Sequence, residues 1–235
     1  MSSSKLASGS AALVAGGSRV TLLNALQVTP DIVVLGFNTL PGNMPNTYGN
    51  FAALWQGTGE IPWSAQPLAI QPIATNTPSG TIAFTGLDLH GNAYVLGYSV
   101  GPTKTGGEAQ KYGNICSTVS IPPGGGPTQD FQTSLALLYV GPDQVLVRFS
   151  TPGGYRPAAN RNWLGLWQGM EASYSQRPQY STPITADSNF GTGTFSGAQI
   201  LVGTTYTIGY FMSGWIGAGQ ANEQTALACS ITFTT

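Results

Sequence analysis

Short apolar runs, separated by glycine, proline and small polar residues, recur along the whole chain. Short apolar runs bounded by turn residues are typical of β-strands rather than of helices. The 32 glycines and 16 prolines leave no long window with a clean helical period. The predicted strands are residues 21–28, 31–39, 51–56, 68–73, 80–85, 93–100 and 114–121, followed by 133–140, 144–150, 163–168, 180–185, 193–196, 205–212 and 226–234.

The pattern is written twice, at an offset of 112 positions. The first half of the repeat aligns without a gap, a slip of one residue places Phe84 on Phe195, and the offset of 112 then returns. A slip confined to the middle indicates a change in loop length. The identical positions include Pro30 with Pro142, Phe37 with Phe149, Asn50 with Asn162, Trp55-Gln56-Gly57 with Trp167-Gln168-Gly169, and Tyr94 with Tyr206.

Seven predicted strands in each copy of roughly 100 residues are typical of an immunoglobulin-like sandwich. We therefore predict an all-β chain with two tandem immunoglobulin-like β-sandwich domains related by internal duplication. The expected divisions are an N-terminal tail over residues 1–17, repeat 1 over 18–123, a Gly/Pro linker over 124–128, and repeat 2 over 129–235.

Several residues at matching places in the two copies are predicted to be structural. Trp55 and Trp167 are expected between the sheets as bulky core residues, and the spacing before Tyr206, partly matched before Tyr94, is that of a tyrosine corner. The two cysteines are expected as small buried residues on the last strand of each copy, with a bridge between the copies as the alternative. They are Cys116 and Cys229.

The strand over residues 163–167 and its partner over 51–55 are apolar on both faces. One face must line the core, so the other is covered by the second domain, by a loop or by another molecule. Phe51 and Trp163 are therefore candidate interface residues.

Three segments of the second copy resemble a known family. They are the valine-rich run 145–152, then Asn162-Trp163-Leu164-Gly165-Leu166-Trp167, then Tyr206-Thr207-Ile208-Gly209-Tyr210. These segments resemble, in order, the strands of the SKICH type of immunoglobulin-like domain, with Asn162 in place of the family's usual Asp. The first copy has Phe51 for Trp163 and Ala53 for Gly165. The resemblance implies a sandwich used for interaction or targeting rather than catalysis.

Charge is scarce. Asp, Glu, Lys and Arg make up 7% of the residues, and the net charge is −1, whereas an average soluble protein has about 25% charged residues. Weak long-range repulsion favours association with other copies, and the lack of basic clusters argues against nucleic acid. No run is long enough for a membrane span, and the weak apolar stretch near the N-terminus does not predict a cleaved leader. We expect a cytoplasmic protein or one exported without a leader.

No set of residues predicts catalysis, a cofactor or a metal site. The single histidine, His90, lies in an expected turn with Asp88 two residues away, which makes an enzyme centred on this pair the least favoured hypothesis. The acidic residues are scattered singly, unlike the clustered ligands of a Ca²⁺ site.

The leading hypothesis is a non-catalytic interaction or structural protein that self-associates, binds a protein partner or packs into a larger assembly. The alternative is a lectin-like module that binds a glycan with loop aromatics, because flat rings stack on sugar C–H groups. Trp63 and Trp215 lie in loops that the two copies do not share, and they are the candidate ligand residues.

Overall fold

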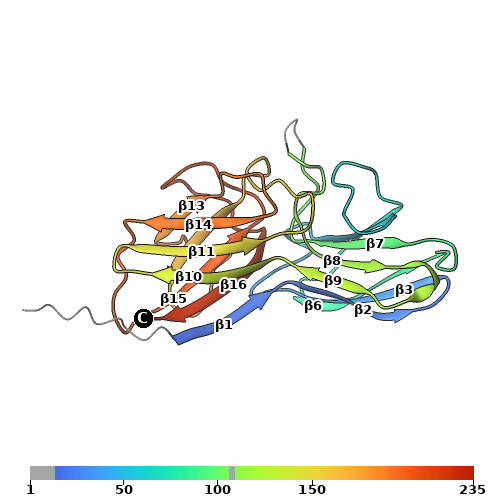
Figure 1. Cartoon of the computed structure of the whole chain (residues 1–235), viewed down its shortest axis with the longest axis horizontal. Coiled ribbons are helices and arrows are strands. Elements are labelled where there is room, and N and C mark those ends of the chain that lie inside the picture. The colour runs from blue at the N-terminus through green and yellow to red at the C-terminus, as the bar shows by residue number, and fades with distance from the viewer. Residues whose placement is uncertain (1–13, 106–108) are drawn as a thin grey trace, which may run out of the picture.

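The computed structural model describes residues 14–105 and 109–235, and its regular structure is almost entirely β-strand (Figure 1). Within these ranges, sixteen strands form four sheets, and the helical structure is one 3₁₀ turn, η1 (Pro123–Gly125). The predicted all-β class is therefore confirmed.

The strands stack as two β-sandwiches that lie side by side (Figure 1). The first consists of a five-stranded sheet in the order β5-β4-β7-β8-β9 and a three-stranded sheet in the order β2-β3-β6. Its strands are β2 (Leu22–Val28), β3 (Ile32–Asn38), β4 (Phe51–Gln56), β5 (Ala69–Pro72), β6 (Ser79–Thr85), β7 (Tyr94–Ser99), β8 (Ile115–Ile121) and β9 (Gln129–Gln132).

The second sandwich has the same layout, with the orders β1-β16-β15-β12-β13 and β10-β11-β14. All pairings are antiparallel, and the register of β4 on β7 recurs in β12 on β15, where Gln56 opposite Tyr94 becomes Gln168 opposite Tyr206. Its strands are β1 (Val14–Val20), β10 (Ser134–Val140), β11 (Gln144–Ser150), β12 (Trp163–Gln168), β13 (Tyr180–Pro183), β14 (Phe190–Ser196), β15 (Thr205–Phe211) and β16 (Leu227–Thr234).

The first strand of each repeat completes the sheet of the other repeat. β1 pairs with β16 of repeat 2, and after Thr21 the chain continues as β2, which pairs with β3 of repeat 1. In the same way β9 pairs with β8 of repeat 1, and after Thr133 the chain continues as β10 in repeat 2. The Thr21 amide donates to the Ala228 carbonyl (3.0 Å) and the Thr133 amide to the Cys116 carbonyl (2.8 Å). The exchange is therefore reciprocal.

β1 and β9 are the two strands that the sequence pattern did not predict. Residues 14–17 were expected in the tail and belong to β1, whereas residues 1–13 lie outside the described residues. Gly124 and Gly125 of the expected linker lie in η1, and β9 follows shortly after. Neither segment has a clear apolar alternation. Each is held mainly by backbone pairing with the edge of an existing sheet, β1 with β16 and β9 with β8.

The core of each sandwich is lined by one face of the central strands. In repeat 2 this face carries Leu164 and Tyr210, and Tyr210 packs on Phe149 of the opposite sheet with ring centroids 5.6 Å apart. In repeat 1 the equivalent Tyr98 stacks on Phe37 at 5.2 Å.

The opposite face of these strands is covered by the chain itself, which corrects the expected position of the tryptophans. Trp167 lies with Trp163 in a separate apolar cluster outside the sandwich core, and Leu40 of repeat 1 joins this cluster. Trp55 packs edge-on against Tyr112 (5.2 Å) and donates through Nε1 to the Ala65 carbonyl. Both tryptophans are buried in apolar clusters, Trp55 in the main one, but they pack beneath loops rather than between the sheets.

Removing β1 should destabilise the second sandwich, because β16 would lose its partner strand. We expect deletion of residues 1–20 to lower the free energy of unfolding by roughly 2–5 kcal/mol relative to deletion of residues 1–13, since several net hydrogen bonds of about 1 kcal/mol each are lost. Urea denaturation of the two truncated chains measures the difference. Equal stabilities would show that β1 does not hold the second sheet.

Candidate functional site

The loops at the junction of the two repeats hold several buried polar side chains, among them Gln110, Asn160 and Asn162. Trp63, in the loop between β4 and β5, packs on Tyr155 of repeat 2 with ring centroids 5.0 Å apart. Its Nε1 donates to the Gly153 carbonyl at 2.9 Å. Gly154 has a φ of 66°, and a Cβ there would lie 3.2 Å from Trp63 Nε1, so this close approach favours glycine.

A matching contact runs in the opposite direction. Tyr174, in the loop between β12 and β13, stacks on Tyr48 of repeat 1 at 5.5 Å and lies over Gly42, which is 112 positions before Gly154. Each repeat thus inserts an aromatic ring over the equivalent turn of the other, as two subunits do across a two-fold interface.

Tyr155 is the buried centre of this junction. Its hydroxyl donates toward the Gly113 carbonyl at 2.7 Å and the Met212 carbonyl at 3.1 Å. The same hydroxyl oxygen accepts a hydrogen bond from Asn162 Nδ2 at 2.8 Å. Asn162 Oδ1 in turn accepts from Tyr210 at 2.7 Å. Burial raises the pKa of Tyr155 well above its usual value, so the phenol stays protonated and acts as a structural donor.

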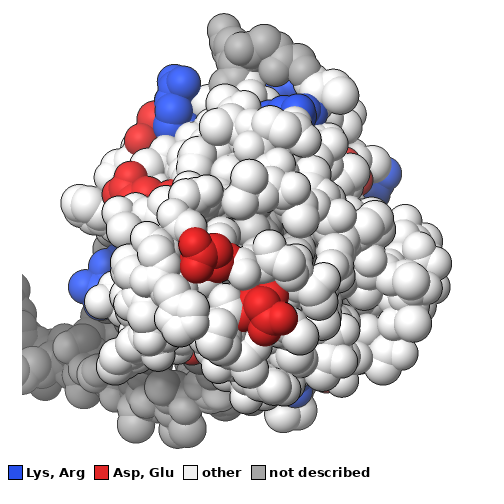
Figure 2. Space-filling model, turned by 90° about the vertical axis from the view of Figure 1, so that its right-hand side faces the viewer, with Lys and Arg blue, Asp and Glu red and all other residues white. Residues whose placement is uncertain are grey.

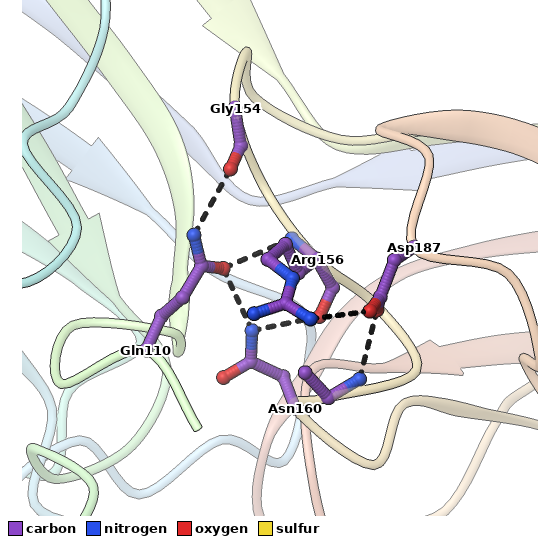
Figure 3. A network of polar contacts seen from close by, with 6 residues as sticks. Gln110, Gly154, Arg156, Asn160 and Asp187 are labelled. Carbon is purple, nitrogen blue, oxygen red and sulfur yellow. Dashed lines mark hydrogen bonds and ion pairs between the residues drawn. The ribbon is translucent and has the colours of Figure 1, made fainter. Parts of the chain in front are cut away.

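A second polar network ties the loop before β8 to repeat 2 (Figure 3). The side chain of Gln110 donates to the Gly154 carbonyl at 2.9 Å, and its Oε1 accepts from the Arg156 amide and from Asn160 Nδ2. Arg156 also pairs with Asp187 at 2.9 Å. Burial acts to raise the pKa of Asp187, but the Ala159 amide and Arg156 outweigh it and hold that pKa below its usual value.

Lys104 reaches from repeat 1 into the same region. Its Nζ donates to the Asn160 carbonyl (3.1 Å), to Asn160 Oδ1 (3.0 Å) and to the Met212 carbonyl (2.8 Å), so all three N–H groups have acceptors. Burial lowers the pKa of Lys104 to about 7, against an opposing effect of Glu223. The ammonium therefore tethers the repeats, and its charge is sensitive to pH near neutrality.

A cleft of about 460 Å³ opens beside Lys104, between the two repeats. Pairs of residues 112 positions apart line it from both sides: Gly101 with Ser213, and Asn114 with Ala226. Each sandwich has one further cleft: about 620 Å³ between β13 and β14 in the second, and about 470 Å³ between β5 and β6 in the first.

The structure buries three of the four predicted ligand or interface residues. Trp63 is 8% exposed and Phe51 and Trp163 are also buried, while Trp215 is half-buried against Trp163 at 6.4 Å. Trp63 is therefore a contact between the repeats and not an exposed platform for a sugar, because Tyr155 already occupies its ring face.

The remaining predicted residues lie apart from the junction cleft. Cys116 and Cys229 are free and buried on β8 and β16. They are not at matching places as expected, because Cys229 lies opposite Tyr210 whereas Ser117 lies opposite the equivalent Tyr98. The hydroxyls of Tyr94 and Tyr206 accept from the Asp88 and Leu201 amides at 3.1 and 3.0 Å. His90 and Asp88 are exposed, and Asp88 accepts a hydrogen bond from Asn92.

Sequence patterns did not identify Lys104, Gln110 or Tyr155, because their partners lie on loops far away in the sequence. One usable signal was present: at the offset of 112, Arg161 falls on Gly49 and Asn114 on Ala226. At both pairs, a polar residue that lines the cleft stands where the other repeat has a small residue.

Across the described ranges, no three His, Cys, Asp or Glu side chains gather as metal ligands would. Those ranges also contain no helix long and apolar enough to cross a membrane. No protein-family model matches this chain, and no curated protein matches it either.

Tyr155→Phe should weaken the junction. The change removes the donor to the buried Gly113 carbonyl, whereas the Met212 carbonyl and Asn162 Nδ2 keep their other partners. We expect the free energy of unfolding to fall by about 1–3 kcal/mol. Tyr139→Phe is the matched control, because Tyr139 is exposed. Urea denaturation giving equal losses for the two variants would show that the Tyr155 hydroxyl does not support the junction.

Lys104 should make stability increase as the pH rises above 7. The folded state releases the Lys104 proton near pH 7, whereas the unfolded chain keeps it to about pH 10.4, so the folded state gains stability over this window. The buried cysteines, whose pKa values are raised, act in the opposite direction above about pH 8.5.

The test compares the wild type with Lys104→Met between pH 7 and 8.5, where the cysteines contribute equally to both proteins. Urea denaturation should give a steeper rise in stability with pH for the wild type. Parallel curves would contradict the lowered pKa of Lys104.

Proposed function

We propose that this chain is a non-catalytic structural protein that self-associates through the exposed edges of β6 and β14. An edge strand carries unpaired backbone groups, and proteins normally shield such edges with charges, proline, bulges or short strands. The edges that lack this shielding are the surfaces at which another strand can add.

Six of the eight edge strands in the described sheets are shielded. β2 and β10 each contain a register shift, and β1 contains both a shift and Arg19. The four-residue β5 and β13 both end in proline, and the four-residue β9 contains Asp130.

The other two edges are open, and this contrast carries the proposal. β6 and β14 are each seven residues long, contain no charge and no proline, and pair with their neighbours without a register shift. The Gln71 side chain donates to the Ala83 carbonyl of β6, which satisfies one group of that edge. Because the two edges lie on different sandwiches, one chain can bind two neighbours and build a larger assembly.

The surface composition supports the same function. The outer face of the β2-β3-β6 sheet exposes Leu22 and Leu26, and the equivalent of Leu26 in repeat 2, Leu138, is also exposed. Figure 2 shows a face with only scattered acidic and basic residues. Little charge repulsion opposes the approach of a second copy, and the sequence resemblance to an interaction domain is in accord with this role.

Charges placed on the open edges should dissolve the assembly in steps. We expect the wild type to form species larger than a dimer at tens of micromolar protein and low salt. Thr81→Lys on β6 should limit association to dimers, and adding Thr192→Lys on β14 should give monomers, because lysine on an edge opposes strand addition. Size-exclusion chromatography with light scattering measures the masses.

Asn38→Lys is the control, because it adds the same charge at an exposed position on the central strand β3. This variant should associate like the wild type. A wild type that is strictly monomeric, or an Asn38→Lys variant that dissociates as fully as the double edge variant, would refute the proposal.

A further inference from the structure

The cleft between the repeats has the size and lining of a site for a small molecule. Its volume of about 460 Å³ lies within the range of about 300–1,000 Å³ that is usual for such sites. Both repeats contribute to its walls, and none of the lining residues belongs to β6 or β14.

Arg161 lines this cleft in a backbone conformation that an arginine adopts at a cost. Its φ is 56°, and it is the one residue other than glycine with positive φ in the described chain. At the equivalent place in repeat 1, Gly49 has a φ of 67°. The turns match further, because the Arg161 amide bonds to the Ala158 carbonyl as the Gly49 amide does to that of Asn46. Glycine would fill this position without strain.

The Arg161 side chain makes no polar contact with the described part of the chain that would stabilise the fold. It is exposed, and within the described residues its guanidinium forms neither an ion pair nor a hydrogen bond. A strained residue that gives no stability in return points to a role in binding.

Asn114 supplies an independent sign of a missing partner. It is 3% exposed and lines the cleft, and its Nδ2 donates to the Pro102 carbonyl at 2.9 Å. Its Oδ1 is buried, and the described residues give it no hydrogen-bond partner. Buried acceptors are nearly always satisfied, and the equivalent residue in repeat 2 is Ala226, so the fold itself does not require an amide here.

The charges around the cleft define what would fit. Arg161 has donors without a partner among the described residues, whereas the Lys104 ammonium contributes charge but has all its donors in use. Glu223 also lines the cleft, and its carboxylate accepts from Thr225 Oγ1 at 2.6 Å, which leaves acceptor capacity. The site therefore offers a cation for one end of a ligand and acceptors for another.

We propose that this cleft binds a small carboxylate that also carries hydrogen-bond donors. The planar guanidinium of Arg161 pairs with the carboxylate, and the donors of the ligand satisfy Asn114 Oδ1 and Glu223. An α-amino acid, through its ammonium, and a sugar acid, through its hydroxyls, both carry this chemistry. The site is independent of strand addition at β6 and β14.

Isothermal titration calorimetry on the intact chain tests the proposal with two arms: the twenty standard amino acids, and D-glucuronate with D-galacturonate. Acetate, which has no donor, and glucose, which has no carboxylate, are the reference probes. At least one acid should bind roughly tenfold or more tightly than either reference, because a hydrogen bond to a charged group contributes about a factor of 10–100. The arm that binds identifies the source of the carboxylate.

Variants separate the site from the fold. Arg161→Gly should weaken binding roughly tenfold or more while leaving the melting temperature unchanged or higher, and Asn114→Ala should also weaken it. Arg148→Gln, an equal change of charge on the exposed face of β11, should bind normally. Binding that Arg161→Gly leaves unchanged would overturn the proposal, as would the failure of both acid classes to bind more tightly than acetate and glucose.

Discussion

The hydrogen-bonded exchange of β1 and β9 is the constraint on which the rest of this structure depends. Each five-stranded sheet contains one strand from the other repeat, so neither sheet is complete by itself. Because Thr21 and Thr133 lie where the chain passes between the sandwiches, the exchange also fixes the distance and angle between them. The two aromatic insertions, Trp63 over Tyr155 and Tyr174 over Tyr48, depend on this placement.

The junction is symmetric in its backbone and asymmetric in its chemistry. The two repeats share strand pairings and turn geometry, but Tyr155 stands where repeat 1 has Asn43, and Arg161 where it has Gly49. The sheet interiors keep their counterparts, such as Tyr98 with Tyr210. Differences at the junction therefore change the polar groups around the cleft while the scaffold stays the same, which is how a fold commonly acquires a site.

The sequence predicted the strands well because short apolar runs lie between turn residues, both in strands buried on two faces, such as β4 and β12, and in strands that bury one face, such as β11. The bounds of β4, β11 and β12 match the predicted ranges. β1 and β9 were missed because their stability comes from pairing with a distant edge. Trp55 and Trp167 were assigned to the wrong face because alternation shows which residues share a face but not which face points inward. The contacts of Lys104 and Gln110 join distant loops and leave no periodic signal.

Self-association and ligand binding would occupy separate parts of this framework, the first at the open edges of the three-stranded sheets and the second at the junction. The exchange itself can be observed directly by NMR in the labelled protein. It predicts short-range nuclear Overhauser effects between Arg19 and Ser230 and between Phe131 and Thr118, which are opposite each other in the sheets. Contacts of Arg19 with β8 and of Phe131 with β16 would instead show that each repeat keeps its own first strand.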